Sequence, residues 1–285
     1  MLPRWLRRIV IWPLPLLVVW LYLATVPLLV IVAFVVSYRL PGKLRALRSL
    51  GLATVYFLVE VGVIVSGFVL WIASGFGWRL GTERFQRAHH RLLAWALRRL
   101  VNAGRRLFAL EIDMRSVGEE RDRRVIADPP DLRLGRPVIV MSRHAGPADS
   151  ILLMYEIVDR FERQPRIVLK ESLQWDPAFD ILLNRLPTHF VRRGEDRDSV
   201  LGHLEQLAAG MGDRDAFVIF PEGGNFTPQR RERAIAYYDE RGRAEEAERA
   251  RRLVNVLPPR TNGALAAMRG CPDAAAVFVA HTGLD

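Results

Sequence analysis

Residues 138–149 read Val-Ile-Val-Met-Ser-Arg-His-Ala-Gly-Pro-Ala-Asp, and this stretch joins an apolar run to the start of a helix. The run Val138–Met141 is short, apolar and mostly β-branched, which favours a buried strand. Pro147 is favoured at the first position of a helix, so a helix is predicted to begin there. A strand followed at once by a helix is the repeating unit of α/β domains.

The same alternation continues toward the C-terminus. Further strands are expected at Ile167–Leu169, His189–Val191, Phe217–Phe220 and Ala276–Ala280, and helices near 147–160, 177–186, 197–211 and 261–269. Short apolar runs without an exposed polar face indicate strands that are covered on both sides. We therefore predict an α/β fold over residues 81–285, with a mostly parallel, buried sheet flanked by helices.

Four other segments complete this domain. Thr82 could cap a basic amphipathic helix that runs to about Arg106, whose apolar face suits a membrane surface and a core equally well. Phe108–Met114 alternates well enough for a strand, and Gly118–Arg136 is expected to be an exposed loop. The segment near 228–252 is dense in Arg and Glu, which predicts a solvated helix or helical hairpin inserted in the domain.

The N-terminal residues 1–80 contain two long apolar runs. Ile9–Tyr38 has no charged residue, and Leu50–Trp78 has only Glu60. About 20 apolar residues in a helix are enough to cross a bilayer. A secretory signal would be shorter and would not be followed by a second run. Three prolines in the first run leave a re-entrant hairpin open, but we predict two transmembrane helices.

Arginines precede the first run, lie between the runs and follow the second, so the positive-inside bias predicts that residues 81–285 lie on the cytoplasmic face of the cell membrane. The net charge of +10 is better matched to anionic lipid headgroups than to nucleic acid, since no nucleic-acid recognition motif is present. Cys271 is the only cysteine, which excludes an internal disulfide. The other histidines show no metal-ligand spacing, so no metal is expected; they are His89, His90, His189, His203 and His281.

His144 and Asp149 are the candidate reactive pair. Residues five apart in one continuous helix point away from each other. With a helix that starts at Pro147, however, His144 lies in the preceding turn and Asp149 in the first helical turn, where the two side chains can meet. A carboxylate there would hold the imidazole in one tautomer, as a general base requires. On spacing alone, a lone histidine and a helix-capping aspartate remain an alternative.

Three further blocks follow this pair, and the order and spacing of all four resemble the glycerophospholipid acyltransferase family, which includes the lysophosphatidic acid acyltransferases. The later blocks contain Lys170, Phe220-Pro221-Glu222-Gly223-Gly224 and Leu257-Pro258-Pro259-Arg260-Thr261. Together the blocks span roughly residues 137–282 and are far more specific than any one alone.

The resemblance implies transfer of a fatty acyl group from acyl-CoA or acyl-carrier protein to the free hydroxyl of a lysophospholipid, above all 1-acyl-glycerol-3-phosphate. His144 would be the general base and Asp149 its partner, with no bound metal or cofactor. The residues that it implies for acceptor binding are Lys170, Arg192, Arg193, Glu222, Gly223 and Arg260. The family commonly has Thr-Arg where this chain has Gly224-Asn225, so Arg230, Arg231 or Arg260 would replace the missing arginine, or the acceptor headgroup differs.

Two other classes of protein fit the sequence less well. A membrane serine lipase or esterase would need an activated serine, and no Gly-x-Ser-x-Gly turn is present. A non-catalytic lipid-binding relative would be expected to lose His144 or Asp149 first, and both are present. An acyltransferase is therefore the preferred interpretation.

Overall fold

The computed structural model describes residues 13–114, 116–117, 125–126 and 135–283. Most of the predicted loop Gly118–Arg136 therefore lies outside the described residues. Two compact units are distinguished: one comprises Met1–Asp131 with Ser172–Leu186, and the other comprises Leu132–Glu171 with Pro187–Asp285.

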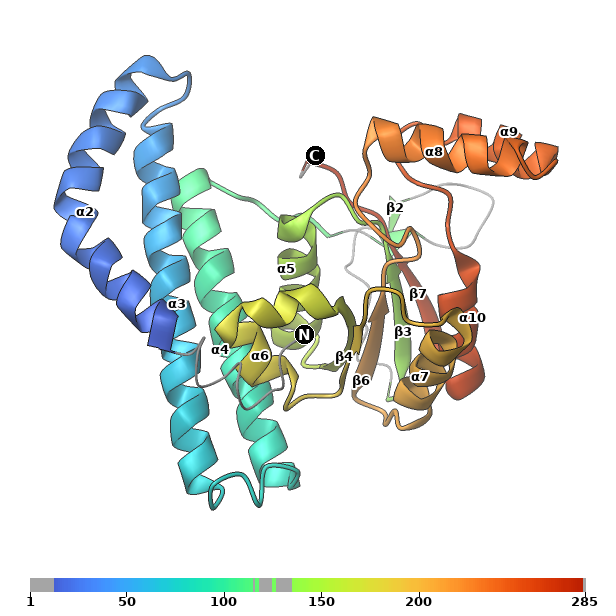
Figure 1. The fold of residues 1–285 in the computed structure, drawn as a ribbon, viewed down its shortest axis with the longest axis horizontal. Helices are drawn as coiled ribbons and strands as arrows, with labels where there is room; N and C mark the ends of the chain where they lie inside the picture. The colour runs from blue at the N-terminus through green and yellow to red at the C-terminus, as the bar shows by residue number, and fades with distance from the viewer. Residues whose placement is uncertain (1–12, 115, 118–124, 127–134, 284–285) are drawn as a thin grey trace. The chain divides into compact units, whose positions relative to one another are not determined.

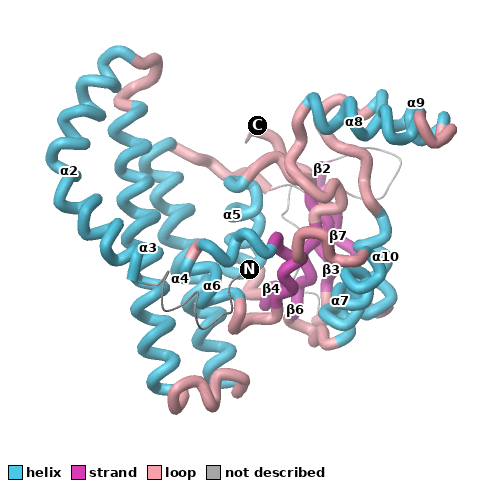
Figure 2. Tube along the Cα trace, viewed as in Figure 1, coloured by secondary structure: helices cyan, strands magenta, loops and turns pink. Residues whose placement is uncertain are grey.

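The first unit is almost entirely helical, as Figure 2 shows. Its long helices are α2 (Pro13–Arg39), α3 (Arg45–Ala73) and α4 (Glu83–Phe108). The segment 172–186 adds most of the 3-10 helix η2 (Glu171–Trp175) and the helix α6 (Pro177–Leu183). Two-residue strands, β1 (Ser116–Val117) and β2 (Val125–Ile126), form a short antiparallel pair.

Helices α2 and α3 correspond to the two apolar runs. Each is long and apolar enough to cross a membrane. At about 1.5 Å per residue each helix is roughly 40 Å long, and a hydrocarbon core is about 30 Å thick. Pro27 lies inside α2 without ending it. The two helices are joined by a 2.7 Å hydrogen bond between the hydroxyls of Tyr22 and Thr54. By length and composition, both helices meet the requirement for a membrane span.

Helix α4 uses its apolar stripe as a core face. The buried residues of the stripe follow helical spacing and include Leu92, Leu93, Ala96, Leu97 and Val101. Trp95 lies against α3 so closely that a Cβ on Gly62 would be 2.5 Å from its ring. Of the two predicted uses of this helix, the structure shows packing in the core.

The prediction of a strand at Phe108–Met114 is wrong. Phe108 is the last residue of α4, and Ala109 ends the helix in the left-handed region with φ 52°. Residues 110–114 have no regular structure. Alternation over so few residues did not distinguish a strand from an irregular segment after a helix.

The second unit contains a five-stranded parallel sheet in the order β5-β4-β6-β3-β7. Its strands are β3 (Val138–Ser142), β4 (Gln164–Lys170), β5 (Thr188–Val191), β6 (Asp215–Ile219) and β7 (Ala275–Val279). All five strands predicted between Val138 and Ala280 are thus present, and the α/β prediction is confirmed. Strand β3 lies between β6 and β7, and every one of its residues is buried.

Helices cover both faces of this sheet (Figure 1). Helix α5 (Pro147–Tyr155), which continues into the π-helical turn η1 (Glu156–Arg160), lies on one face. Helices α7 (Arg197–Ala209) and α10 (Thr261–Gly270) pack together on the other. Their small residues share a buried cluster with the sheet residues Ile139, Met141 and Phe217.

The charged segment near 228–252 forms two helices, α8 (Pro228–Asp239) and α9 (Ala244–Arg252). No residue of α8 is buried. A 2.7 Å ion pair between Arg251 and Asp239 joins the two helices. This part of the chain is a solvated helical hairpin.

Because all five strands are parallel, their carboxyl ends lie at one edge of the sheet. The turns that follow them begin after Ser142, Lys170, Val191, Ile219 and Val279. Ligands of open α/β sheets bind outside this edge. Seven candidate site residues lie in or near these turns: His144, Asp149, Lys170, Arg192, Arg193, Glu222 and Gly223. Arg230 and Arg231 lie in α8, and Arg260 precedes α10.

Candidate functional site

His144 lies in the turn between β3 and α5. Gly146 is fully extended, with φ −175°, and the helix begins at Pro147, as the sequence predicted. Asp149 therefore falls in the first turn, and its carboxylate folds back toward the turn. The Nδ1 atom of His144 is 3.3 Å from Oδ2 of Asp149. The structure thus brings the predicted pair together.

Asp149 is buried and is held mainly by backbone donors. Its Oδ2 accepts hydrogen bonds from the N–H groups of Gly146, at 3.0 Å, and Ala145. Burial alone would raise the pKa of Asp149, but these N–H donors and His144 hold the pKa below its ordinary value. An ionised Asp149 favours the tautomer of His144 with its proton on Nδ1, which leaves the lone pair on Nε2. The same carboxylate both caps the helix and orients the imidazole.

Glu222 holds the backbone of His144. Its Oε1 accepts the His144 N–H at 3.0 Å, and its Oε2 accepts the N–H of Leu257 at 2.8 Å. The carbonyl of His144 in turn accepts a hydrogen bond from the N–H of Phe226 at 3.1 Å. The buried Glu222 side chain therefore connects the turn after β3 with the segment before α10. The resemblance had implied a contact with the acceptor and gave no indication of this role.

The ring of His144 also packs against an aromatic side chain. Phe220, at the end of β6, lies with its ring centroid 4.5 Å from that of His144, and the ring planes are tilted by 30°. The imidazole is thus fixed by its backbone, by Asp149 and by Phe220. A general base needs such a defined orientation.

Gly223 and Arg260 lie side by side. Gly223 adopts φ +69°, a conformation that favours glycine, and a Cβ there would be 3.4 Å from Cδ of Arg260. The backbone N–H of Arg260 donates to the carbonyl of Pro221 at 2.7 Å. The third and fourth sequence blocks are therefore joined at this point, and the exposed side chain of Arg260 lies beside the turn.

Two of the three proposed substitutes for the missing arginine lie at the turn that contains Gly224-Asn225. Arg260 lies against the preceding Gly223, and Arg230 donates to the Asn225 carbonyl at 2.9 Å. Arg231 instead donates to the carbonyls of Leu253 and Arg251. Its guanidinium is bound to the end of α9.

Lys170, Arg192 and Arg193 form a separate group. Lys170 ends β4 and pairs in register with Val191, and the two arginines follow directly after Val191. All three side chains are exposed. Within the described ranges, none of them hydrogen-bonds to His144, Asp149 or Glu222. The structure places them at the same sheet edge but does not bring them into contact with the histidine.

A family model described as acyltransferase matches residues 118–274, which is more than half of the chain. The chain belongs to the acyltransferase family. Searches of curated proteins and of solved structures found no match. The matched residues of this acyltransferase include His144, Asp149, Glu222 and Arg260.

His281 lies beyond the matched residues, and its spacing along the chain predicted no role in the site. It follows β7, the neighbour of β3, and its Nε2 is 3.5 Å from Oδ2 of Asp149. The same Nε2 is 3.2 Å from the carbonyl oxygen of Arg143. Two imidazoles of this acyltransferase thus contact one carboxylate. The only sequence signal was a histidine shortly after a strand, because the strand order could not be read from the chain.

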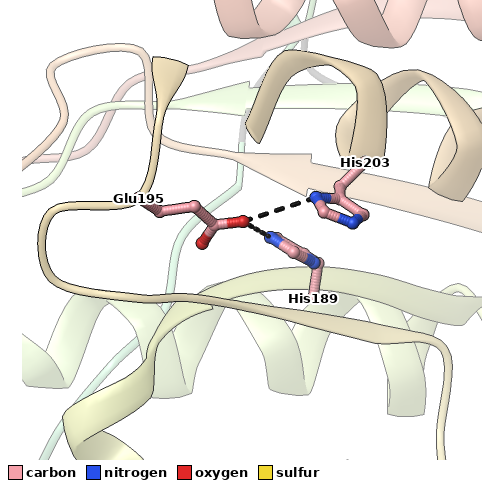
Figure 3. A group of neighbouring side chains, drawn as sticks. All are labelled: His189, Glu195 and His203. Atoms are coloured by element: carbon pink, nitrogen blue, oxygen red, sulfur yellow. Dashed lines mark ion pairs between the residues drawn. The ribbon is translucent and has the colours of Figure 1, made fainter. Parts of the chain in front are cut away.

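A second group was also missed, away from the His144 pair. His189, Glu195 and His203 bring three potential ligand atoms within 4.8 Å of one another, as Figure 3 shows. Their spacing along the chain gave no metal-binding pattern. They are the residues of this acyltransferase, among those described, that could hold a metal ion.

Proposed function

We propose that this acyltransferase moves a fatty acyl group from acyl-CoA or acyl-carrier protein to the free hydroxyl of a lysophospholipid. The acceptor that the sequence blocks favour is 1-acyl-glycerol-3-phosphate, which would give phosphatidic acid. The observation that carries the proposal is the contact between His144 Nδ1 and the ionised Asp149 at the carboxyl edge of the sheet. This contact leaves Nε2 of His144 as the atom that accepts a proton.

In the proposed reaction, Nε2 of His144 removes the proton of the acceptor hydroxyl as its oxygen attacks the thioester carbonyl. The new C–O bond forms and the C–S bond breaks. The imidazolium then gives its proton to the departing thiolate, which leaves as a free thiol. Asp149 stabilises the protonated imidazole. Because the acceptor oxygen attacks the thioester directly, no covalent enzyme intermediate is required.

The phosphate of the acceptor needs positive hydrogen-bond donors. Arg260 is the first candidate, because it lies beside Gly223 in the turn after β6, and Glu222 in that turn holds the backbone of His144. Arg230, which donates to the Asn225 carbonyl, is the second candidate in this turn. Lys170, Arg192 and Arg193 are proposed as a second positive group on the same edge.

The proposed location is the cell membrane, with the second unit on the cytoplasmic side. The apolar helices α2 and α3 support membrane association, and the arginines around them support the orientation. A single-chain lipid acceptor partitions into the bilayer. Anchoring the enzyme there would keep its sheet edge near the headgroups.

The departure at Gly224-Asn225 supports a second candidate, in which the acceptor carries another headgroup. A Cβ at Gly224 would lie 2.7 Å from Nη1 of Arg230, so the family's threonine would displace that guanidinium. The local structure is therefore adapted to its own pair of residues. A different lysophospholipid would still use the same base and the same bond changes.

The test is acyl transfer by the purified full chain in liposomes, with labelled acyl-CoA or acyl-carrier protein and a panel of lysophospholipids. His144→Ala is compared with His90→Gln, a control on α4. Transfer to lysophosphatidic acid that is lost only in His144→Ala would support the proposal, whereas transfer to another lysolipid alone would favour the second candidate. Fatty acid release without an acceptor would indicate a hydrolase, and no turnover with either donor would indicate a non-catalytic relative.

A further inference from the structure

His189, Glu195 and His203 come from three successive parts of the second unit. His189 is in β5, Glu195 is in the loop after that strand, and His203 is in α7. Figure 3 shows both imidazoles directed at one carboxylate oxygen. Nε2 of His189 is 3.7 Å from Oε1 of Glu195, and Nδ1 of His203 is 3.4 Å from the same atom.

These separations suit ligands of one ion. Bonds of about 2.0–2.2 Å to a tetrahedral ion place ligand atoms roughly 3.3 Å apart. The two distances to Glu195 are close to that value, and all three ligand atoms lie within 4.8 Å of one another. Only small side-chain movements would be needed to centre an ion between them.

The pair of histidines is not explained by hydrogen bonding alone. Nε2 of His189 is buried and, among the described residues, has no hydrogen-bond partner. The two rings stack with centroids 4.5 Å apart and planes 19° from parallel, which aims both rings at the same oxygen. A buried nitrogen without a partner is costly unless something binds it.

We propose that His189, Glu195 and His203 bind a divalent first-row transition ion, with zinc as the leading case. Two imidazole nitrogens and one carboxylate oxygen form a donor set that favours such ions over calcium or magnesium, which prefer oxygen ligands alone. The side chain of His203 is 46% exposed, so the ion can enter from solvent and keep a water ligand.

The ion would act on the loop that carries Arg192 and Arg193. Oε2 of Glu195, the oxygen that does not face the histidines, accepts a hydrogen bond from the N–H of Arg192 at 2.8 Å. Fixing Glu195 with an ion would therefore fix the backbone at Arg192. This consequence rests on the proposed function, because it makes the ion a support for acceptor binding; the ion takes no part in the bond changes.

The direct test is cobalt binding, which does not depend on activity. The full chain, without a polyhistidine tag, is treated with a chelator in detergent and titrated with Co²⁺ while visible absorption is recorded. We expect saturation at about one equivalent, displacement by Zn²⁺, and an affinity at least about tenfold lower in His203→Ala and Glu195→Gln. The control His90→Gln should bind cobalt like the wild type.

Either of two results would overturn the site: no saturable cobalt signal in the wild type, or the same affinity in both ligand variants when their circular dichroism shows intact folding. The functional arm is separate. If cobalt binds as expected, chelation should raise the KM for the lysophospholipid and leave the KM for the acyl donor unchanged. A chain that binds cobalt but transfers no acyl group would preserve the metal site and refute the proposed function.

Discussion

Glu222 accepts a hydrogen bond from the backbone N–H of His144 at 3.0 Å and thereby holds the main chain of the proposed base in place. Asp149 contacts the ring of the same histidine, so two carboxylates hold different parts of one residue. Glu222 fixes the main chain and Asp149 fixes the imidazole. This division makes Glu222 a positioning residue in the proposed reaction.

Replacing Glu222 with Gln tests that role. The amide would present an N–H₂ group to one of two backbone N–H donors, so one of them would lose its acceptor at a cost of about 1–3 kcal/mol. We expect kcat to fall with the KM for the acceptor little changed, together with a lower free energy of unfolding. Kinetics and denaturant unfolding would measure both effects. A raised KM for the acceptor with normal kcat and stability would instead show direct acceptor contact.

The lowered pKa of Asp149 predicts a pH-dependent contribution to stability. A carboxyl whose pKa is lower when folded stabilises the protein above its unfolded pKa, about 3.9, and that stabilisation disappears as the pH falls through the folded value. Asp149→Asn should therefore destabilise the protein at pH 7, and the difference from wild type should shrink below about pH 4. Urea unfolding at several pH values measures it; a difference that grows on acidification would contradict the assignment.

Arg260 is predicted to bind the acceptor phosphate. A charge-assisted hydrogen bond contributes about 1.5–3 kcal/mol, so Arg260→Gln should raise the KM for the phosphate-bearing acceptor roughly 10- to 100-fold. The KM for the acyl donor should not change. Arg269→Gln is the matched control, since that arginine lies in α10, the helix that Arg260 precedes, and pairs with Glu205 at the surface. If kcat alone fell in Arg260→Gln, its role would be to support the Gly223 turn.

Two glycines test the packing of α7 against α10. A Cβ at Gly270 would collide with the backbone carbonyl oxygen of Glu205, so Gly270→Ala should destabilise the chain by about 1–3 kcal/mol. Gly202 is in α7 with nothing within 4 Å of its would-be Cβ, so Gly202→Ala should stabilise by about 0.4–1 kcal/mol. Unfolding in detergent would compare the two. If both substitutions changed the free energy of unfolding equally, α7 and α10 would be able to move apart at little energetic cost.

The parts of the site that the sequence predicted are the local ones. Pro147 marks the start of α5, and from that start the meeting of His144 with Asp149 follows by geometry over five residues. The five strands were also recognisable, because buried apolar runs lie between helical segments. At Phe108–Met114 the same kind of local pattern misled, since Ala109 ends the helix and no strand forms.

The parts that could not be predicted depend on which strands are neighbours. His281 reaches Asp149 because β7 pairs with β3, and no local pattern specifies that pairing. The contact between Glu222 and His144 depends on the pairing of β6 with β3. His189 and His203 meet through the packing of a strand with a helix. Each contact joins segments that are separate in the sequence and that the order of strands and helices in the fold brings together.

The order of the strands also bears on when the reactive centre can form during synthesis. In the described part of the chain, β3 pairs with β6 and β7, which are synthesised after β4 and β5. Long-range parallel pairing is slow to form and leaves edges exposed until it is complete. The strand that leads to His144 is made early and gains both partners late. A nascent chain thus carries its two apolar helices well before the turn with His144 acquires its final surroundings, so the proposed reactive pair would be completed only after both helices have been made.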